Sequence, residues 1–357
     1  MPDDGLAERL ADRVLQLVDV PSESHDEAAL AAHVLDVLGR AGAGSARDAG
    51  DTCIVAGATA RGDRPLVLLA GHLDTVPAQG NFPGSRDDEW VHGLGAADMK
   101  AALGVMVELA LAPPPDATVD VGFVFFGREE LPFGDSALSP LLARESGLRD
   151  ADLVVVMEPT DNALHAGCVG NINATWTFRG TAGHSARPWL ADNAIHRAGA
   201  GIAAVAAREP IDHQFAGLTF REVVSVVTIH GGVARNVVPD TCVAEVNMRY
   251  APGTSAADAE ATLRELCEPY GEIVIDGNAP SGAVPDGNAL VDRLVAAGDL
   301  AIAPKQAWTP VAEFAAAGVD AINFGPGHPQ YAHRRDERVA IASLAQSYTT
   351  LARFLCA

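Results

Sequence analysis

The chain has 357 residues, a formal net charge of -22 at pH 7 and a hydrophobic content of 48%. This charge argues against nucleic acid or an anionic membrane surface as a partner, and the apolar content is that of a folded protein. No apolar stretch reaches the ~20 residues needed to span a bilayer. The five cysteines form no C-x-x-C pair, which favours reduced thiols over a disulfide framework or a thiolate zinc site.

The N-terminal stretch, residues 1–18, is acidic and amphipathic and lacks the basic start and apolar core of a signal peptide. We expect it to form the first helix of a cytoplasmic protein.

Apolar runs and helical patterns alternate through the first half of the chain. Buried strands are predicted at 66–71, 119–127 and 151–158, and a helix with apolar residues at three-to-four spacing is predicted at 98–111. This alternation predicts an α/β domain with a mixed, mostly parallel sheet and helices on both faces.

The pattern changes near residue 170. Residues 171–184 and 241–253 alternate polar and apolar side chains, as half-exposed antiparallel strands do, and helical patterns cover 190–209 and 255–271. We therefore expect a smaller α+β domain at 171–277 that interrupts a catalytic domain made of 1–170 and 278–357.

Polar side chains follow the predicted strands of the larger domain, where the ligands of open parallel sheets usually bind. Each has an ordinary interpretation when taken alone, such as a loop histidine, a helix cap or a solvated acid. Burying so many acids in one crevice without a cation would cost several kcal/mol each. The residues are His72, Asp74, Asp98, Glu129, Glu130, Glu158, His328 and His333.

Histidine nitrogens and carboxylate oxygens without thiolates favour zinc, with cobalt or manganese as substitutes. Two histidines and three carboxylates exceed the ligands of one catalytic zinc. With one carboxylate bridging, they suffice for two metals about 3.5–4 Å apart.

The ordered motifs GHLDTVP, GLGAADMK, GREE, EPT, GTAGHSARP, GGVARNVVPD and FGPG…AHRRDE resemble those of the dinuclear zinc M20 peptidases and deacylases. The resemblance covers nearly the whole chain. Within the family, VPSESHDEAALA, AGCVG and HSARPWLADNAIH are most similar to succinyl-diaminopimelate desuccinylases of actinobacterial type.

The resemblance implies two Zn²⁺ per subunit, with His72 and Glu158 on one ion, Glu130 and His333 on the other, and Asp98 between them. Asp74 would accept a hydrogen bond from His72, and Glu129 would be the general base. The peptide bond after Asp98 is expected to be cis. His333 is preferred to His328, which we interpret as a turn residue near the mouth of the site.

The resemblance also implies residues that contact the substrate. His184 resembles the histidine that reaches across a homodimer to polarise the scissile carbonyl. Asn236 and Arg249 are expected to hold substrate carboxylates, and Gly325 and Gly327 to let the backbone approach the substrate.

Four residues depart from the family pattern: Leu94, Val169, Pro310 and Arg334. None is a predicted metal ligand. The last three are expected near the substrate pocket, so they bear on the substrate and not on the chemistry.

The leading hypothesis is two-zinc hydrolysis of N-succinyl-L,L-diaminopimelate to succinate and L,L-diaminopimelate, in lysine and peptidoglycan synthesis. One alternative keeps the mechanism but changes the substrate, as in an N-acetylornithine-type deacetylase or another N-acyl amino acid or dipeptide hydrolase. A second alternative is a catalytically inactive protein of this family that binds a ligand. It is disfavoured because Glu129 and all five metal ligands are present.

Overall fold

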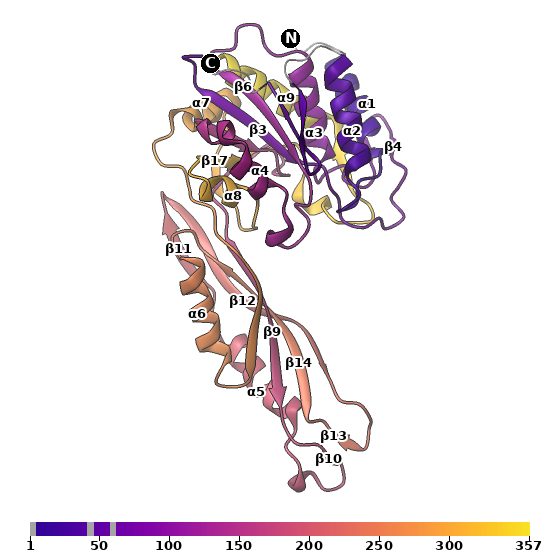
Figure 1. Cartoon of the computed structure of the whole chain (residues 1–357), viewed down its shortest axis with the longest axis vertical. Coiled ribbons are helices and arrows are strands. Elements are labelled where there is room, and N and C mark those ends of the chain that lie inside the picture. The colour runs from indigo at the N-terminus through magenta and orange to yellow at the C-terminus, as the bar shows by residue number, and fades with distance from the viewer. Residues whose placement is uncertain (1–4, 41–45, 58–61) are drawn as a thin grey trace. The chain divides into compact units, whose positions relative to one another are not determined.

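The computed structural model describes residues 5–40, 46–57 and 62–357, and the chain divides into two compact units (Figure 1). Unit 1 comprises Met1–Gly167, Ala283–Lys305 and Thr309–Ala357, and unit 2 comprises Cys168–Gly282 and Gln306–Trp308. The domain expected at 171–277 lies within unit 2.

Unit 1 is built on an eight-stranded mixed sheet of order β1-β2-β6-β3-β7-β17-β8-β16. The central neighbours β6, β3, β7 and β17 are parallel, whereas the pairs β1–β2, β2–β6 and β17–β8 are antiparallel. The apolar runs predicted as buried strands correspond to β3, β6 and β7. The strands are β1 (Arg47–Gly50), β2 (Cys53–Ala56), β3 (Leu66–His72), β6 (Asp120–Phe126), β7 (Leu153–Val156), β8 (Leu164–Ala166), β16 (Ile302–Pro304) and β17 (Ala321–Asn323).

Helices cover this sheet. The predicted helix at 98–111 begins at Lys100 in the structure, and its side chains are buried nearly all round because it contacts β3 as well as α1 and α9. The helices of unit 1 are α1 (Leu6–Val18), α2 (Ala28–Arg40), α3 (Lys100–Leu111), α4 (Leu138–Arg144), α7 (Ala289–Gly298), α8 (Val311–Ala316) and α9 (Ile341–Cys356). Residues 1–4 of the predicted first helix lie outside the described residues.

A second, three-stranded sheet in unit 1 has the order β18-β5-β4. Short 3-10 turns lie between the larger elements. These segments are β4 (Ser85–Arg86), β5 (Trp90–His92), β18 (Arg338–Ala340), η1 (Phe133–Asp135), η2 (Ser146–Asp150) and η4 (Pro329–Tyr331).

Unit 2 is an antiparallel sheet of order β11-β12-β14-β9-β15. Its core forms where α5 and α6 pack on the sheet, with Trp176 fully buried against Phe178 and donating Nε1–H to the Cys267 carbonyl at 3.1 Å. The elements are β9 (Gly170–Arg179), β10 (Gly183–His184), η3 (Pro188–Leu190), α5 (Ala194–Ala206), β11 (Ile211–Phe215), β12 (Leu218–Gly231), β13 (Val237–Val238), β14 (Thr241–Tyr250), α6 (Ala256–Cys267) and β15 (Glu272–Ala279).

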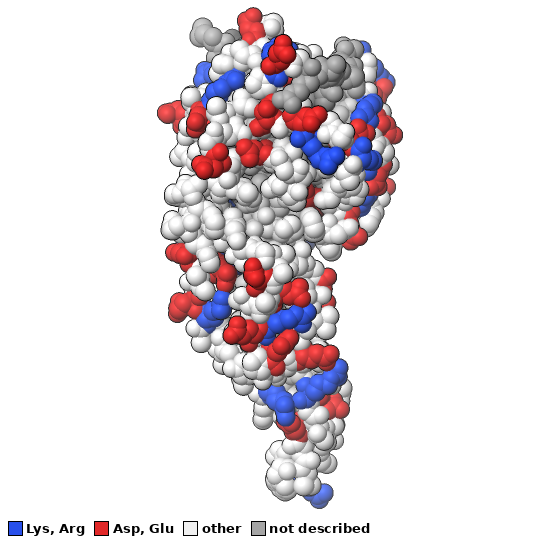
Figure 2. Space-filling view, turned by 60° about the vertical axis from the view of Figure 1, so that its left-hand side comes forward, with Lys and Arg blue, Asp and Glu red and all other residues white. Residues whose placement is uncertain are grey.

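On the face drawn in Figure 2, acidic side chains are spread over both units and basic ones lie among them. None of the described helices has the length and apolar character needed to cross a membrane. No disulfide joins any of the five cysteines, all of which lie in the described part of the chain, and burial raises the pKa of the Cys53 and Cys267 thiols to about 11.

Candidate active site

The parallel strands of unit 1 bring the predicted ligands to one edge of the sheet. His72 is the last residue of β3 and pairs with Phe126, the last residue of β6. The chain then continues from β6 to Glu129 and Glu130, and from β7 to Glu158. Because these strands are adjacent and parallel, their carboxyl ends place histidine and carboxylate groups together.

Asp98 lies between the two histidines of the cluster. His72 Nε2 is 3.2 Å from Asp98 Oδ1 and 3.8 Å from Glu158 Oε1, whereas His333 Nε2 is 3.5 Å from Asp98 Oδ2 and 2.8 Å from Glu130 Oε1. The peptide bond from Asp98 to Met99 is cis, as expected.

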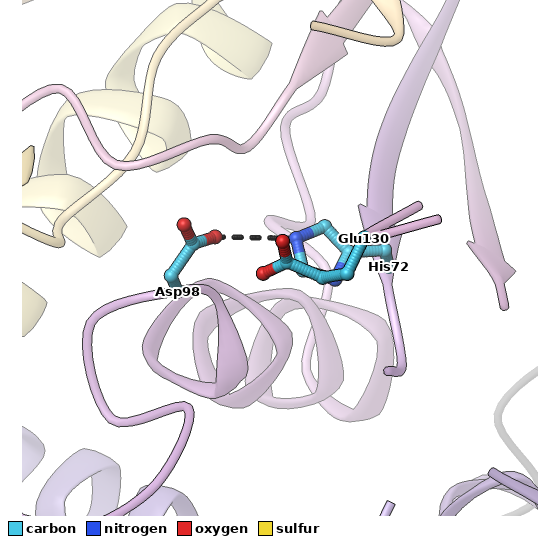
Figure 3. Close-up of side chains that lie close together, drawn as sticks. All are labelled: His72, Asp98 and Glu130. Atoms are coloured by element: carbon cyan, nitrogen blue, oxygen red, sulfur yellow. Dashed lines mark hydrogen bonds and ion pairs between the residues drawn. The ribbon is translucent and has the colours of Figure 1, made fainter. Parts of the chain in front are cut away.

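Three of these residues offer ligand atoms within a very small space. One ligand atom each from His72, Asp98 and Glu130 lies within 4.8 Å of the others. Figure 3 shows Asp98 facing the other two side chains. This spacing suits a metal ion bound by nitrogen and oxygen ligands.

The electrostatics of the cluster call for a cation. Burial and the nearby Glu158 carboxylate raise the pKa of Glu129 well above its usual value, and burial and Asp98 raise the pKa of Glu158 to about 7. Glu158 Oε1 is buried and accepts no hydrogen bond from the described residues. A divalent cation would pair this oxygen and offset the repulsion between the carboxylates, so the residues fit a metal.

Asp74 lies beside the ring of His72 and contacts it through both its backbone carbonyl and its carboxylate. His72 Nδ1 lies 3.0 Å from the backbone carbonyl of Asp74, while the nearer carboxylate oxygen is 3.6 Å away. That carboxylate accepts hydrogen bonds from Ser24 Oγ and from the backbone N–H groups of Glu129 and Glu130, at 2.8–3.0 Å. Asp74 therefore fixes the ring of His72 mainly through its main chain, and its side chain fixes the GREE segment.

The two late histidines have different surroundings. His333 is in the cluster, where hydrogen bonds to Asp98 and Glu130 raise its pKa to about 11. His328 caps the short η4 turn, with its Nδ1 accepting the N–H of Gln330 at 3.1 Å, as its interpretation as a turn residue predicted.

Unit 2 holds the other predicted polar residues. His184 in β10 pairs with Val237 in β13, and Ser185 N–H donates to the carbonyl of Asn236, so His184 and Asn236 are close neighbours. Arg249 is half-buried in β14 and lines a cavity of about 430 Å³ together with Thr219, Arg221, Val223 and Gln306.

Gly325 and Gly327 of the FGPG motif lie too close to neighbouring backbone to carry a side chain. A Cβ on Gly325 would lie 2.2 Å from the carbonyl oxygen of Met157, and one on Gly327 would lie 2.2 Å from that of Ala97. At these two points the FGPG segment packs against the backbone just before Glu158 and just before Asp98. The contact with substrate that the resemblance implied is not needed to explain them.

The departures from the family pattern have ordinary surroundings in the structure. Val169 is fully buried in unit 2, Pro310 occupies the N-cap position of α8, and the exposed Arg334 pairs with Asp336 at 2.8 Å.

Two buried charged residues beside the cluster were missed from the sequence. Lys305 is 7% exposed and donates to the carbonyl of Pro159, next to Glu158, at 3.3 Å. Glu337 is 2% exposed and accepts hydrogen bonds from the segment that ends at Asp98. Only the RRDE run that follows His333 could have drawn attention to Glu337, and a charge run usually indicates a solvated surface.

Comparison with known proteins identifies the family to which this chain is similar. Residues 68–357 match the family described as peptidase family M20/M25/M40. A Mycobacterium tuberculosis protein, provisionally named succinyl-diaminopimelate desuccinylase, is 38% identical over 95% of this chain and 96% of its own. The succinyl-diaminopimelate desuccinylase of Corynebacterium glutamicum is 33% identical over 95% of this chain and 94% of its own.

A solved structure agrees at the level of the fold. The M20 family metallo-carboxypeptidase Sso-CP2 of Sulfolobus solfataricus superposes with a TM-score of 0.78 at 15% identity, covering 99% of both chains. With the family match and the two full-length relatives, this shows that the chain belongs to peptidase family M20/M25/M40 and is a hydrolase of amide bonds.

Proposed function

We propose that this protein uses two zinc ions to hydrolyse the N-succinyl amide of N-succinyl-L,L-diaminopimelate to succinate and L,L-diaminopimelate, a step of lysine and peptidoglycan synthesis. The observation that carries the proposal is the His–Asp–Glu cluster of unit 1, built on the buried His72 and found in a chain whose full-length relatives bear this activity in their names. Five cysteines without a disulfide among the described residues support a cytoplasmic location.

In this proposal His72 and Glu158 hold one ion, Glu130 and His333 hold the other, and Asp98 bridges them. The distances from Asp98 to both histidines support the bridging role. Cobalt or manganese could replace zinc at such nitrogen and oxygen ligands. When bound, the ions would lower the pKa of water and polarise the amide carbonyl.

Glu129 is the general base. It takes one proton from the attacking water as the oxygen adds to the amide carbon, and it gives that proton to the leaving nitrogen as the C–N bond breaks. A carboxylate placed beside the cluster can carry out both proton transfers. Its backbone N–H, held at 2.9 Å by Asp74, keeps it beside the cluster.

The polar residues of unit 2 would recognise the substrate. His184 Nδ1 accepts the N–H of Ala186 at 3.0 Å, so a neutral ring carries its proton on Nε2 and can donate to a developing oxyanion. Asn236 lies next to it. The half-buried guanidinium of Arg249, which bonds only the neutral Asn247 at 3.0 Å among the described side chains, is suited to a substrate carboxylate.

The proposed active form is a homodimer. Along β12, β11 pairs only with Leu218–Glu222, so the corresponding edge of residues 223–231 has no strand partner in the described part of the chain. Val227 and Ile229 on this stretch are 59% and 44% exposed. A long, apolar, unpaired edge is suited to pairing with a second copy.

The substrate assay is the first test. The zinc-loaded protein should release succinate from N-succinyl-L,L-diaminopimelate, and a chelator should abolish the reaction. N-acetyl-L-ornithine and a panel of dipeptides serve as competing substrates. Faster turnover of one of those would assign the same chemistry to another acyl group, whereas ligand binding without any turnover would favour an inactive binding protein.

Replacing Glu129 by Gln should lower kcat by about 10²–10⁴-fold, because the amide cannot move the proton. The variant should still bind two zinc ions, since this residue is not a ligand. Metal content and steady-state rates measure the two effects separately. Wild-type rates in this variant would remove Glu129 from the proposed role.

Zinc binding at pH 8 should release protons. His333 is protonated in the metal-free protein, because Asp98 and Glu130 raise its pKa to about 11, and only the neutral ring binds zinc. Affinity should therefore rise with pH. Calorimetry in two buffers of different ionisation enthalpy measures the release, and His333→Asn should reduce it by about one proton. Heats that do not depend on the buffer would contradict this.

Two lysine substitutions, one at each edge of the unit 2 sheet, test the proposed dimer interface. Val227→Lys should convert the protein to a monomer, because a lysine on an exposed edge strand disfavours pairing with a second strand. Val274→Lys is the control, because Val274 is 50% exposed on β15 at the opposite edge. Light scattering after size-exclusion chromatography measures both. If the Val227 variant stays dimeric, or both variants dissociate, this edge is not the interface.

A further inference from the structure

We propose that Glu337 is a positioning residue of the metal site, whose buried carboxylate holds the turn that carries Asp98 against the loop that carries His333. The inference rests on the two-metal function proposed above and adds to it a residue that contacts no metal ion itself.

One carboxylate satisfies three backbone donors. Glu337 Oε2 accepts the N–H of Gly95, and Oε1 accepts the N–H groups of Ala97 and Asp98, each at 3.0 Å. Glu337 is 2% exposed, so water does not substitute for these bonds. The carboxylate therefore fixes the main chain of Asp98 directly.

Pairing between strands β18 and β5 places Glu337 at this position. Arg338 of β18 pairs with His92 of β5, and the next step is the bond from Gly93 N–H to the Glu337 carbonyl at 3.1 Å. The strand pairing thus ends where the side chain of Glu337 enters the turn before Asp98.

The same two segments also meet at the cluster. His333, four residues before Glu337, has a left-handed backbone with φ of 60°, and its Nε2 lies 3.5 Å from Asp98 Oδ2. The loop from His333 to Glu337 is thus tied to the Asp98 turn at both ends. Glu337 thereby sets the distance between the proposed bridging carboxylate and one proposed ligand of the second ion.

A carboxylate is the group that this turn requires. Its two oxygens accept all three N–H groups, whereas the amide of Gln has one accepting oxygen and an NH₂ that would face a donor. Asp keeps the charge but is one methylene shorter, so it can reach only part of the turn.

Glu313 provides a matched control in the same unit. It is also 2% exposed, and its carboxylate accepts hydrogen bonds from Ser139 N–H at 2.9 Å, Ser139 Oγ at 2.7 Å and Ser136 Oγ at 2.9 Å. It holds α8 against the start of α4 and none of its hydrogen bonds involves a proposed ligand. A purely structural role for Glu337 would make the two glutamates behave alike.

The experiment titrates Co²⁺ into the metal-free wild type, Glu337→Gln and Glu313→Gln, following the cobalt absorption spectrum and binding heats. Circular dichroism and Tm establish that each variant is folded. We expect Glu337→Gln to bind at least one of the two ions 10–100-fold more weakly, with an altered spectrum. Glu313→Gln should lose thermal stability but keep both affinities and the wild-type spectrum.

Equal affinities and spectra in all three proteins would overturn the inference while leaving the two-metal function in place. A wild type that does not bind two ions would instead overturn the proposed function and the inference with it. If Glu337→Gln does not fold, Glu337→Asp is judged by the same comparison. It should show a smaller loss of affinity in the same direction, and wild-type binding in this variant would overturn the inference.

Discussion

The structure of unit 1 depends on keeping several carboxylates close together where water is scarce. Asp98, Glu129, Glu130 and Glu158 converge on one place, and burial raises the pKa of Glu129 and Glu158. Such a cluster without cations can persist only by holding protons, and a bound divalent ion removes that need. The clearest sign of this need is the buried Oε1 of Glu158, which accepts no hydrogen bond from the described residues. The surrounding fold supplies the rigidity that keeps like charges from moving apart.

That rigidity comes from two sources. The parallel strands β6, β3 and β7 fix the segments bearing His72, Glu129, Glu130 and Glu158 through the ladder hydrogen bonds of the sheet. Asp98 lies outside that sheet and needs support of another kind, which its backbone bond to Glu337 provides. Asp74 plays a comparable part for the GREE segment. In both cases a buried carboxylate organises main-chain N–H groups, and the ligand side chain is positioned as a result.

The sequence allowed much of this arrangement to be predicted, because strand ends and buried runs have local signals. The apolar run before His72 ends where β3 ends, and the choice of His333 over His328 agrees with its place in the cluster. The bonds from Glu337 to the Asp98 turn join residues about 240 positions apart, and no periodicity in the chain reports them. The hydrogen bond from His72 to the carbonyl of Asp74, at a shorter distance than to its carboxylate, depends on a turn geometry that residue types alone do not specify.

In the proposed function, the division of the chain into two units separates the metal chemistry from substrate recognition. The cluster of unit 1 is held by hydrogen bonds between its own members, such as those from His72 to Asp98 and from His333 to Glu130. The residues proposed to read the substrate lie in unit 2, where the cavity beside Arg249 is lined by side chains such as Thr219 and Gln306 that touch no proposed ligand. Changes in that cavity can alter which acyl group is accepted without disturbing the metal site. In the proposed function, the residues of this cavity are therefore the first to vary when the acyl specificity of the chain is tested.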